Sequence, residues 1–184
     1  MNKITLLITA LITSFSSFAQ EINIGGSFGT GVGRETRGML SCGMIIEYRP
    51  RKTILSFNTE PSVLFYSKQI NGSAYREQVV GSVPVYLKLN IGHKLRFCPF
   101  AGGLITTTSA YGITAGFTIE YRIKDRIFMF VKNDFNHLYY KTIHPSYLDP
   151  PEAITESASL FWISFGTKVN VFGLRKQKNK AIRI

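Results

Sequence analysis

Nine charged residues lie on the polar side of segments in which apolar and polar residues alternate. They are Glu47, Arg49, Glu60, Lys88, Glu120, Arg122, Lys132, Asp134 and Lys168. If these faces point into a closed barrel, four acids meet five bases in a narrow lumen, where an unpaired charge costs several kcal/mol. The set therefore predicts a structural ion-pair network that closes the lumen, with a gated conduit or a proton-sensitive site as the alternative.

Two histidines raise the question of catalysis. His144 precedes Pro145 and Ser146 in the longest predicted loop, and His137 lies near the end of a predicted strand. A lipid-modifying enzyme of the outer membrane is one hypothesis, because a His and a Ser near a barrel rim suit such chemistry. A catalytic triad needs groups within mutual hydrogen-bond reach, and no acid stands at a diagnostic spacing. We therefore predict no catalytic residues and no enzyme.

The cysteines and the other ligand types indicate no metal and no cofactor. Cys42 and Cys98 fall on the second and fifth predicted strands, which are not neighbours. We expect two unpaired thiols, with Cys42 facing lipid, although a disulfide is the alternative in an oxidising compartment. No spacing typical of a metal site is present.

β-strands must position these residues. The chain has 184 residues, enough for one domain, with 45% apolar and 18% charged residues and a net charge of +11. In residues 83–92, Val83, Val85, Leu87, Leu89 and Ile91 share one face, which is the period of a strand. Eight such stretches are predicted: 21–33, 38–49, 53–66, 78–91, 96–107, 111–123, 127–140 and 157–172. Tight basic turns at 49–52, 92–94 and 124–126 alternate with longer loops at 67–77 and 141–156.

Three features favour a barrel that spans a membrane over a soluble, lipocalin-like ligand-binding barrel. The polar faces carry small residues that suit a crowded lumen: Gly25, Ser27, Gly29, Gly31, Ser41, Gly43, Ser164 and Gly166. Several stretches exceed the usual five to six residues of globular strands. Aromatic residues gather near strand ends, as in interfacial girdles: Tyr48, Phe65, Tyr66, Tyr121, Tyr139, Tyr140 and Phe172. The sequence thus predicts an all-β, eight-stranded antiparallel up-and-down transmembrane β-barrel.

Both ends of the chain differ from the barrel in composition. Residues 1–19 combine one lysine, a short apolar run and a small-residue end, which predicts a secretory signal peptide and leaves residues 20–172 as the barrel. Residues 173–184 form a basic tail that either lies on anionic lipid or is a disordered end.

One loop is the best candidate for contact with a partner. Loops on a rigid scaffold are where binding residues concentrate, and residues 141–156 with Tyr140 before them contain the candidates Tyr140, His144, Tyr147 and Asp149. The alternative is a lid over the barrel mouth.

A short motif resembles the hallmark of a known family. The segment Ser82-Val-Pro-Val-Tyr-Leu-Lys-Leu-Asn-Ile-Gly, followed by Phe97-Cys-Pro-Phe-Ala-Gly-Gly, is similar to the PorT-like outer-membrane β-barrel family. The resemblance implies an exported outer-membrane barrel, and the family's named member is associated with a protein-secretion apparatus. Such barrels usually end in the aromatic residue of the last strand, whereas here residues 173–184 follow Phe172.

These observations together predict an integral outer-membrane barrel that acts as a structural or interaction protein, accessory to a secretion or envelope complex. The expected partners are outer-membrane lipids and other envelope or secretion proteins. We expect a monomeric barrel with no nucleic-acid partner.

Overall fold

The computed structural model describes residues 19–33, 36–50, 53–70, 74–144 and 152–172. Most of the predicted signal peptide (residues 1–18) and the basic tail (173–184) lie outside these residues, as do Tyr147 and Asp149 of the predicted partner loop. Within the described part of the chain, no helix is long and apolar enough to cross a membrane.

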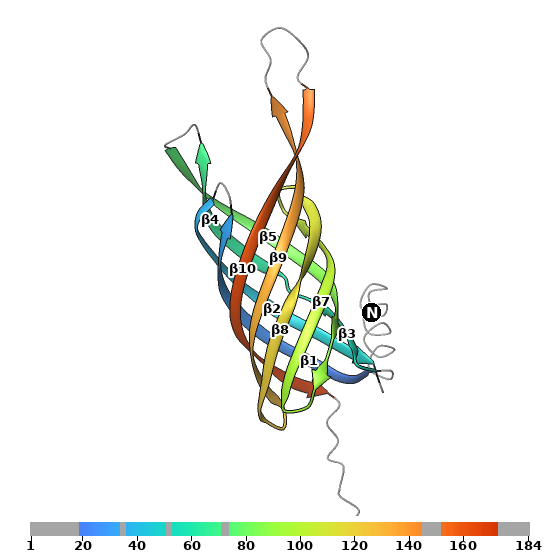
Figure 1. Cartoon of the computed structure of the whole chain (residues 1–184). Coiled ribbons are helices and arrows are strands. Elements are labelled where there is room, and N and C mark those ends of the chain that lie inside the picture. The colour runs from blue at the N-terminus through green and yellow to red at the C-terminus, as the bar shows by residue number, and fades with distance from the viewer. Residues whose placement is uncertain (1–18, 34–35, 51–52, 71–73, 145–151, 173–184) are drawn as a thin grey trace, which may run out of the picture.

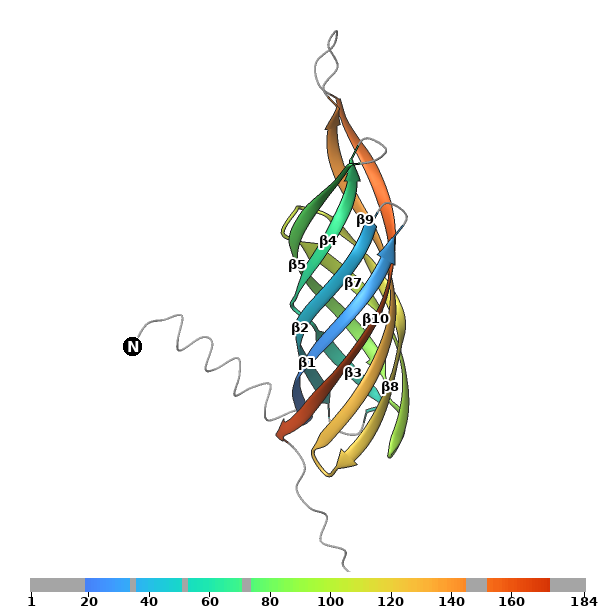
Figure 2. The ribbon, with the colours of Figure 1, turned by 90° about the vertical axis from the view of Figure 1, so that its left-hand side faces the viewer.

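Ten strand segments form one closed antiparallel sheet (Figure 1). They are β1 (Ala19–Gly33), β2 (Thr36–Pro50), β3 (Leu55–Thr59), β4 (Ser62–Ile70), β5 (Ala74–Leu89), β6 (Ile91–Gly92), β7 (Leu95–Thr106), β8 (Tyr111–Lys124), β9 (Ile127–His144) and β10 (Glu152–Phe172). Apart from β3 with β4 and β5 with β6, consecutive segments pair, and β10 pairs with β1 to close the barrel. The strands run obliquely to the barrel axis (Figure 2), as closure requires.

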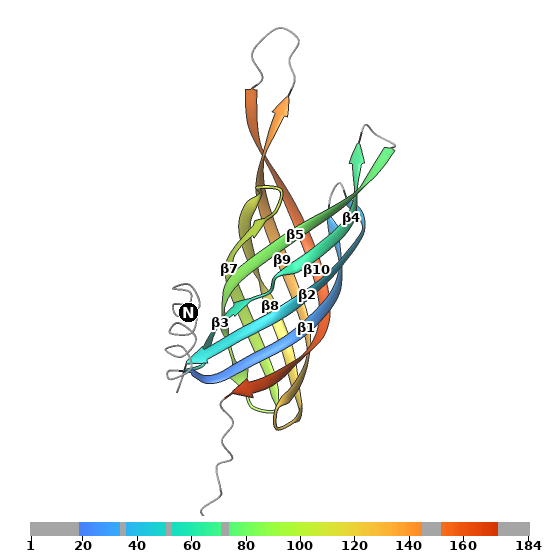
Figure 3. The ribbon, with the colours of Figure 1, turned by 180° about the vertical axis from the view of Figure 1, so that it is seen from behind.

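The ten segments form the eight strands of the barrel. Figure 3 shows β3 and β4 following one another between β2 and β5, and both pair with these two strands. The two residues of β6 continue β5 along β7. Each of these eight strands corresponds to one predicted stretch, and β3 with β4 corresponds to residues 53–66.

The predicted continuous strand 53–66 is wrong at one point, because the ladder is interrupted at Glu60 and Pro61. Pro61 has no N–H to donate, and its carbonyl accepts the N–H of Met44 at 2.9 Å. The N–H of Glu60 reaches the carbonyl of Pro84 at 3.3 Å. The side-chain alternation continues across the interruption, so Glu60 still points inward and is buried.

The barrel is apolar outside and polar inside. Among the described residues, 35 large apolar side chains are exposed, whereas 12 apolar residues are buried. Buried polar residues include Glu47, Lys88, Glu120 and Lys168. This inverts the pattern of soluble proteins and matches a barrel in lipid. The predicted eight-stranded transmembrane barrel is therefore confirmed, and the lipocalin-like alternative, which requires solvent-exposed polar faces, is not supported.

The two ends of the barrel differ. At the turn end, β8 and β9 are joined by a tight turn at Asp125 and Arg126, and Gly92, the last residue of β6, adopts φ of 108°. At the opposite end, here called the loop end, the β4–β5 and β9–β10 hairpins rise beyond the other strands (Figure 1). The predicted loops 67–77 and 141–156 are shorter than expected, because pairing continues to Ile70–Ala74 and to His144–Glu152. Because backbone hydrogen bonds between strands require no apolar face, the strands continue into the polar segments that flank the predicted stretches.

Aromatic residues lie outside near both ends, although two predicted members do not. The Lys94 ammonium lies 5.5 Å from the Tyr121 ring centre at the turn end, and Tyr111 meets Tyr139 at 5.9 Å near the loop end. Tyr66 and Tyr140 were expected in these girdles, but they line an internal cavity. Each stands at an even-numbered position of a strand whose even positions point inward.

Candidate functional site

Four charged residues from four strands meet inside the barrel. This charge quartet consists of Glu47 of β2, Lys88 of β5, Glu120 of β8 and Lys168 of β10. Lys88 Nζ lies 2.9 Å from Glu47 Oε1 and 2.7 Å from Glu120 Oε1. Lys168 Nζ lies 2.5 Å from Glu120 Oε1 and also contacts Glu47 Oε2. Two ammonium groups thus bridge the same two carboxylates, and the quartet is neutral as a whole.

A second cluster lies nearer the loop end, and here it is called the Lys132 cluster. Lys132 Nζ lies 2.5 Å from Glu60 Oε2 and 2.8 Å from Asp134 Oδ2. The hydroxyl of Ser27 donates to Glu60 Oε1 at 2.5 Å. The residue at the interrupted strand, Glu60, is therefore held by groups from β1 and β9.

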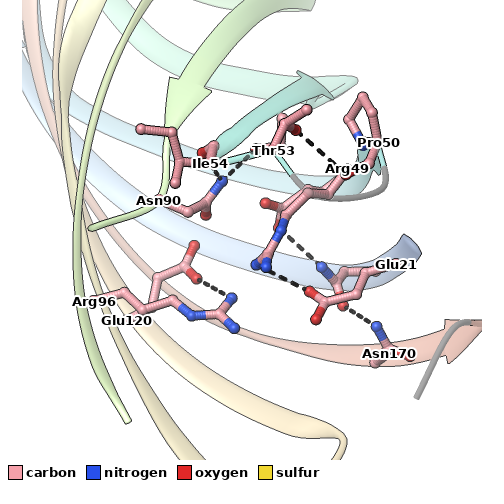
Figure 4. Close-up of polar contacts among 12 residues, drawn as sticks. Glu21, Arg49, Pro50, Thr53, Ile54, Asn90, Arg96, Glu120 and Asn170 are labelled. Atoms are coloured by element: carbon pink, nitrogen blue, oxygen red, sulfur yellow. Dashed lines mark hydrogen bonds and ion pairs between the residues drawn. The ribbon is translucent and has the colours of Figure 1, made fainter. Parts of the chain in front are cut away.

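Further polar pairs fill the turn end, as Figure 4 shows. Arg49 Nη1 lies 3.3 Å from Glu21 Oε2, and Arg96 Nη1 lies 4.0 Å from Glu120 Oε2. Asn170 donates to Asn23 Oδ1 at 3.0 Å, and Asn23 donates to Glu47 Oε2 at 3.2 Å. These amides connect the turn end to the charge quartet.

One aromatic ring supports three of the cations. Phe128 is 1% exposed. Its ring centre lies 4.8 Å from the Arg96 guanidinium carbon, 5.3 Å from that of Arg122 and 5.5 Å from Lys168 Nζ. A ring face attracts cations at such distances. Phe128 therefore helps to hold the excess positive charge at this end.

Polarity changes along the lumen, and the inward positions of β10 follow the change. From the turn end these positions are Asn170, Lys168, Gly166, Ser164, Trp162 and Leu160. Trp162 and Leu160 pack with Met39 in an apolar cluster, which Leu64, Tyr66 and Leu138 extend. The lumen is thus charged in its turn-end half and apolar in its loop-end half.

The structure brings together most of the predicted lumen residues. Glu47, Lys88, Glu120 and Lys168 form one group, and Glu60, Lys132 and Asp134 form another. Arg49 instead pairs with Glu21, and Arg122 lies against Phe128.

Two lumen residues were missed, Glu21 and Arg96. Arg96 was left out of the predicted lumen set, yet it is 3% exposed. The available signal was strand parity, the rule that every second residue of a strand faces the same side. Arg96 stands two residues before the buried Cys98, and Glu21 stands two residues before the buried Asn23. Both are the first residues of predicted strands, 21–33 and 96–107, so the alternation of side chains along each strand already places them inward.

His137 contacts a serine, but on the outer side of the barrel. His137 and Ser159 are paired across β9 and β10, with 3.0 Å between Nδ1 and Oγ. The imidazole also meets the Tyr139 ring edge-on at 4.8 Å. Among the contacts recorded for the described residues, none joins this imidazole to a carboxylate, which a triad uses to orient its base.

The cysteines lie on opposite sides of the wall. Both are free thiols, Cys42 exposed on the outer face and Cys98 fully buried. The Cys98 thiol donates to Asn90 Oδ1 at 3.7 Å. Among the described residues, no three His, Cys, Asp or Glu side chains are grouped so as to hold a metal ion.

The predicted partner loop is only partly described. Tyr140 belongs to β9 and lines the cavity at the loop end. His144 is the last residue of β9, opposite Glu152. Of the four candidates, only these two therefore lie on described strands.

Solved structures share this fold at low sequence identity. The crystal structure of Neisserial surface protein A matches with a TM-score of 0.56 at 10% identity, over 80% of this chain and 96% of that chain. Outer membrane protein AlkL, solved by solid-state NMR in DMPC bilayers, matches at 0.52 and 14% identity, over 83% and 91%. A de novo designed transmembrane β-barrel matches at 0.51 and 12% identity, over 83% and 97%.

These matches establish architecture only. A designed barrel fits nearly as well as the natural proteins, so the fold alone points to no activity. No family model matches this sequence, and neither does any curated protein. The PorT-like resemblance therefore stays a prediction, and the chain is similar in fold to small transmembrane β-barrels.

Proposed function

We propose that this chain is an integral outer-membrane protein with a lumen closed to solutes, and that it acts as an interaction scaffold rather than as a channel or an enzyme. The observation that carries the proposal is the charge quartet. Its four residues come from β2, β5, β8 and β10, and none is more than 3% exposed.

Closure follows from the cost of disturbing this quartet. A solute crossing the lumen would have to separate ammonium and carboxylate groups that already satisfy one another. Removing one partner from a buried pair costs about 3–5 kcal/mol. The Lys132 cluster adds a second obstacle of the same kind between the quartet and the loop end.

The interaction role rests on the hairpin that projects furthest and on the sequence resemblance. The β9–β10 hairpin presents a long pair of strands beyond the barrel (Figure 1), where binding residues tend to lie. The PorT-like resemblance favours a partner from a secretion or envelope complex. The predicted signal peptide and the fold match to an outer membrane protein, AlkL, support placement in that membrane.

Conductance tests the closed lumen. The purified barrel, inserted in planar bilayers, is expected to give no stepwise current. Insertion is verified separately by protection of the strands from protease. A well-inserted wild-type barrel that conducts small ions would disprove the ion-pair plug.

Site-specific crosslinking in cells tests the scaffold role. A photoreactive residue at position 147, in the β9–β10 connection, is expected to form a discrete adduct with an envelope protein identified by mass spectrometry. The matched control places the same residue at Asp125, in the exposed turn at the opposite end. Adducts at 125 alone would show that the partner binds the turn end and not the β9–β10 hairpin, and adducts at neither position would oppose the interaction role.

A further inference from the structure

The loop-end half of the lumen contains a cavity that the ion-pair clusters do not fill. The cavity has a volume of about 540 Å³ and is lined by apolar residues that include Met39, Leu64, Val80, Leu138 and Leu160. The lumen next to the Lys132 cluster leaves only about 50 Å³. Since an eight-stranded barrel is just wide enough to be filled by its own side chains, the larger cavity is a departure that needs an explanation.

The chemistry of the lining is restricted. None of the described side chains that line this cavity carries a charge. The polar groups include Tyr66 and Gln78, and the Tyr66 hydroxyl donates to Gln78 Oε1 at 2.9 Å. The amide nitrogen of Gln78 and the oxygen of Tyr66 keep capacity to bond a hydroxyl or carbonyl group. Small-molecule sites combine such an apolar wall with a few polar groups, in cavities of about 300–1,000 Å³.

We propose that this cavity binds one molecule of an uncharged amphiphile, a long-chain alcohol or acylglycerol, with its chain toward Leu160 and its hydroxyl near Gln78 and Tyr66. An ionised ligand is disfavoured, because the described part of the lining offers no counter-charge and burying an unpaired charge is costly. This site does not depend on the scaffold role, since neither the charge quartet nor the β9–β10 connection takes part in it.

The cavity has a built-in reporter. Trp162 is the single tryptophan of the chain. It is 5% exposed and packs with Met39 and Leu160, two residues of the cavity lining. A heavy-atom quencher that enters the cavity will therefore reduce the only tryptophan signal of the protein.

The test uses the full mature chain in lipid nanodiscs, with a terminally brominated decanol as the probe. Quenching of Trp162 is expected to saturate near one bound molecule per barrel and to be reversed by excess unbrominated decanol. The ionised brominated decanoate is expected to bind at least about tenfold more weakly. Quenching that rises linearly without saturation, or equal binding of the carboxylate, would overturn the proposal.

Adjacent valines supply a matched pair of variants. Val80 is 4% exposed and lines the cavity, whereas Val79 is 65% exposed on the lipid side. Val80→Phe is expected to abolish the saturable quenching, and Val79→Phe is expected to preserve it. Saturable quenching that survives in a folded V80F barrel would contradict the site. If V80F does not fold, the displacement by unbrominated decanol on the wild-type protein decides alone.

Discussion

Replacing Lys168 by Met tests whether the charge quartet stabilises the barrel. Lys168 Nζ contacts both Glu47 and Glu120, and Lys88 contacts the same two carboxylates. The substitution leaves two buried carboxylates with one ammonium group between them. Both carboxylates are 1% exposed or less, so water cannot replace the lost partner. Breaking a buried pair in this way costs about 3–5 kcal/mol, and at 1.36 kcal/mol per factor of ten the folding equilibrium falls about 10²- to 10⁴-fold.

The free energy of unfolding is measured by denaturant titration in detergent micelles, with Trp162 fluorescence as the signal. Lys124→Met is the control, because Lys124 is exposed at the turn end; its expected change stays below about 0.5 kcal/mol. Adding Glu47→Gln to Lys168→Met restores charge neutrality, and we expect a favourable coupling of about 1–3 kcal/mol between the two changes. A loss from Lys168→Met no larger than that from Lys124→Met, or strictly additive effects in the double variant, would refute the electrostatic explanation.

Two other predictions concern the wall of the barrel. Gly25→Val is expected to lower the free energy of unfolding by about 1–3 kcal/mol through overpacking, because a Cβ at Gly25 would lie 2.6 Å from Lys168 Cβ. Gly26→Val is the control, since its Cβ meets nothing closer than 3.8 Å, and equal losses in the same denaturant titration would contradict the assigned inward face. In the folded barrel, an apolar maleimide is expected to label the exposed Cys42 much faster than the buried Cys98. Mass spectrometry of the single variants Cys42→Ser and Cys98→Ser measures both rates, and equal rates would show that the register is wrong.

The inward face of each strand could be predicted because it depends only on parity. Along a strand, successive side chains point to opposite sides, so Glu47, Lys88 and Glu120 were placed in the lumen without knowledge of the neighbouring strands. The same alternation applies to Glu21 and Arg96, but each is the first residue of a predicted strand, and both were left out of the lumen set.

The pairing of acids with bases could not be predicted from the sequence. Lys168 meets Glu47, which is 121 residues away, and Lys88 meets Glu120 across the lumen. Contacts between strands that are not neighbours depend on the tilt and stagger of the whole barrel. Alternation within one strand contains no information about either quantity.

The cavity was missed for a different reason. Tyr66 and Tyr140 were assigned to an aromatic girdle on the basis of residue type and position near strand ends. Their even-numbered positions place them inside, alongside Leu64 and Leu138. Residue type and parity gave opposite predictions at these two positions. Parity was correct, because the backbone geometry of a strand determines which side of the sheet a side chain faces.

The division of the lumen into two halves has a physical basis in the closed sheet. In a barrel, hydrogen bonds between neighbouring strands satisfy the backbone N–H and C=O groups of the wall. The wall therefore does not depend on a continuous core in the interior. The charge quartet connects β2, β5, β8 and β10 across the lumen, and this cross-bracing is concentrated toward the turn end. The loop-end half is held by the wall and by the cluster of Met39, Leu160 and Trp162. Because the bracing lies elsewhere, this half can leave space unfilled without loss of closure, which is the condition that a ligand cavity inside so narrow a barrel requires.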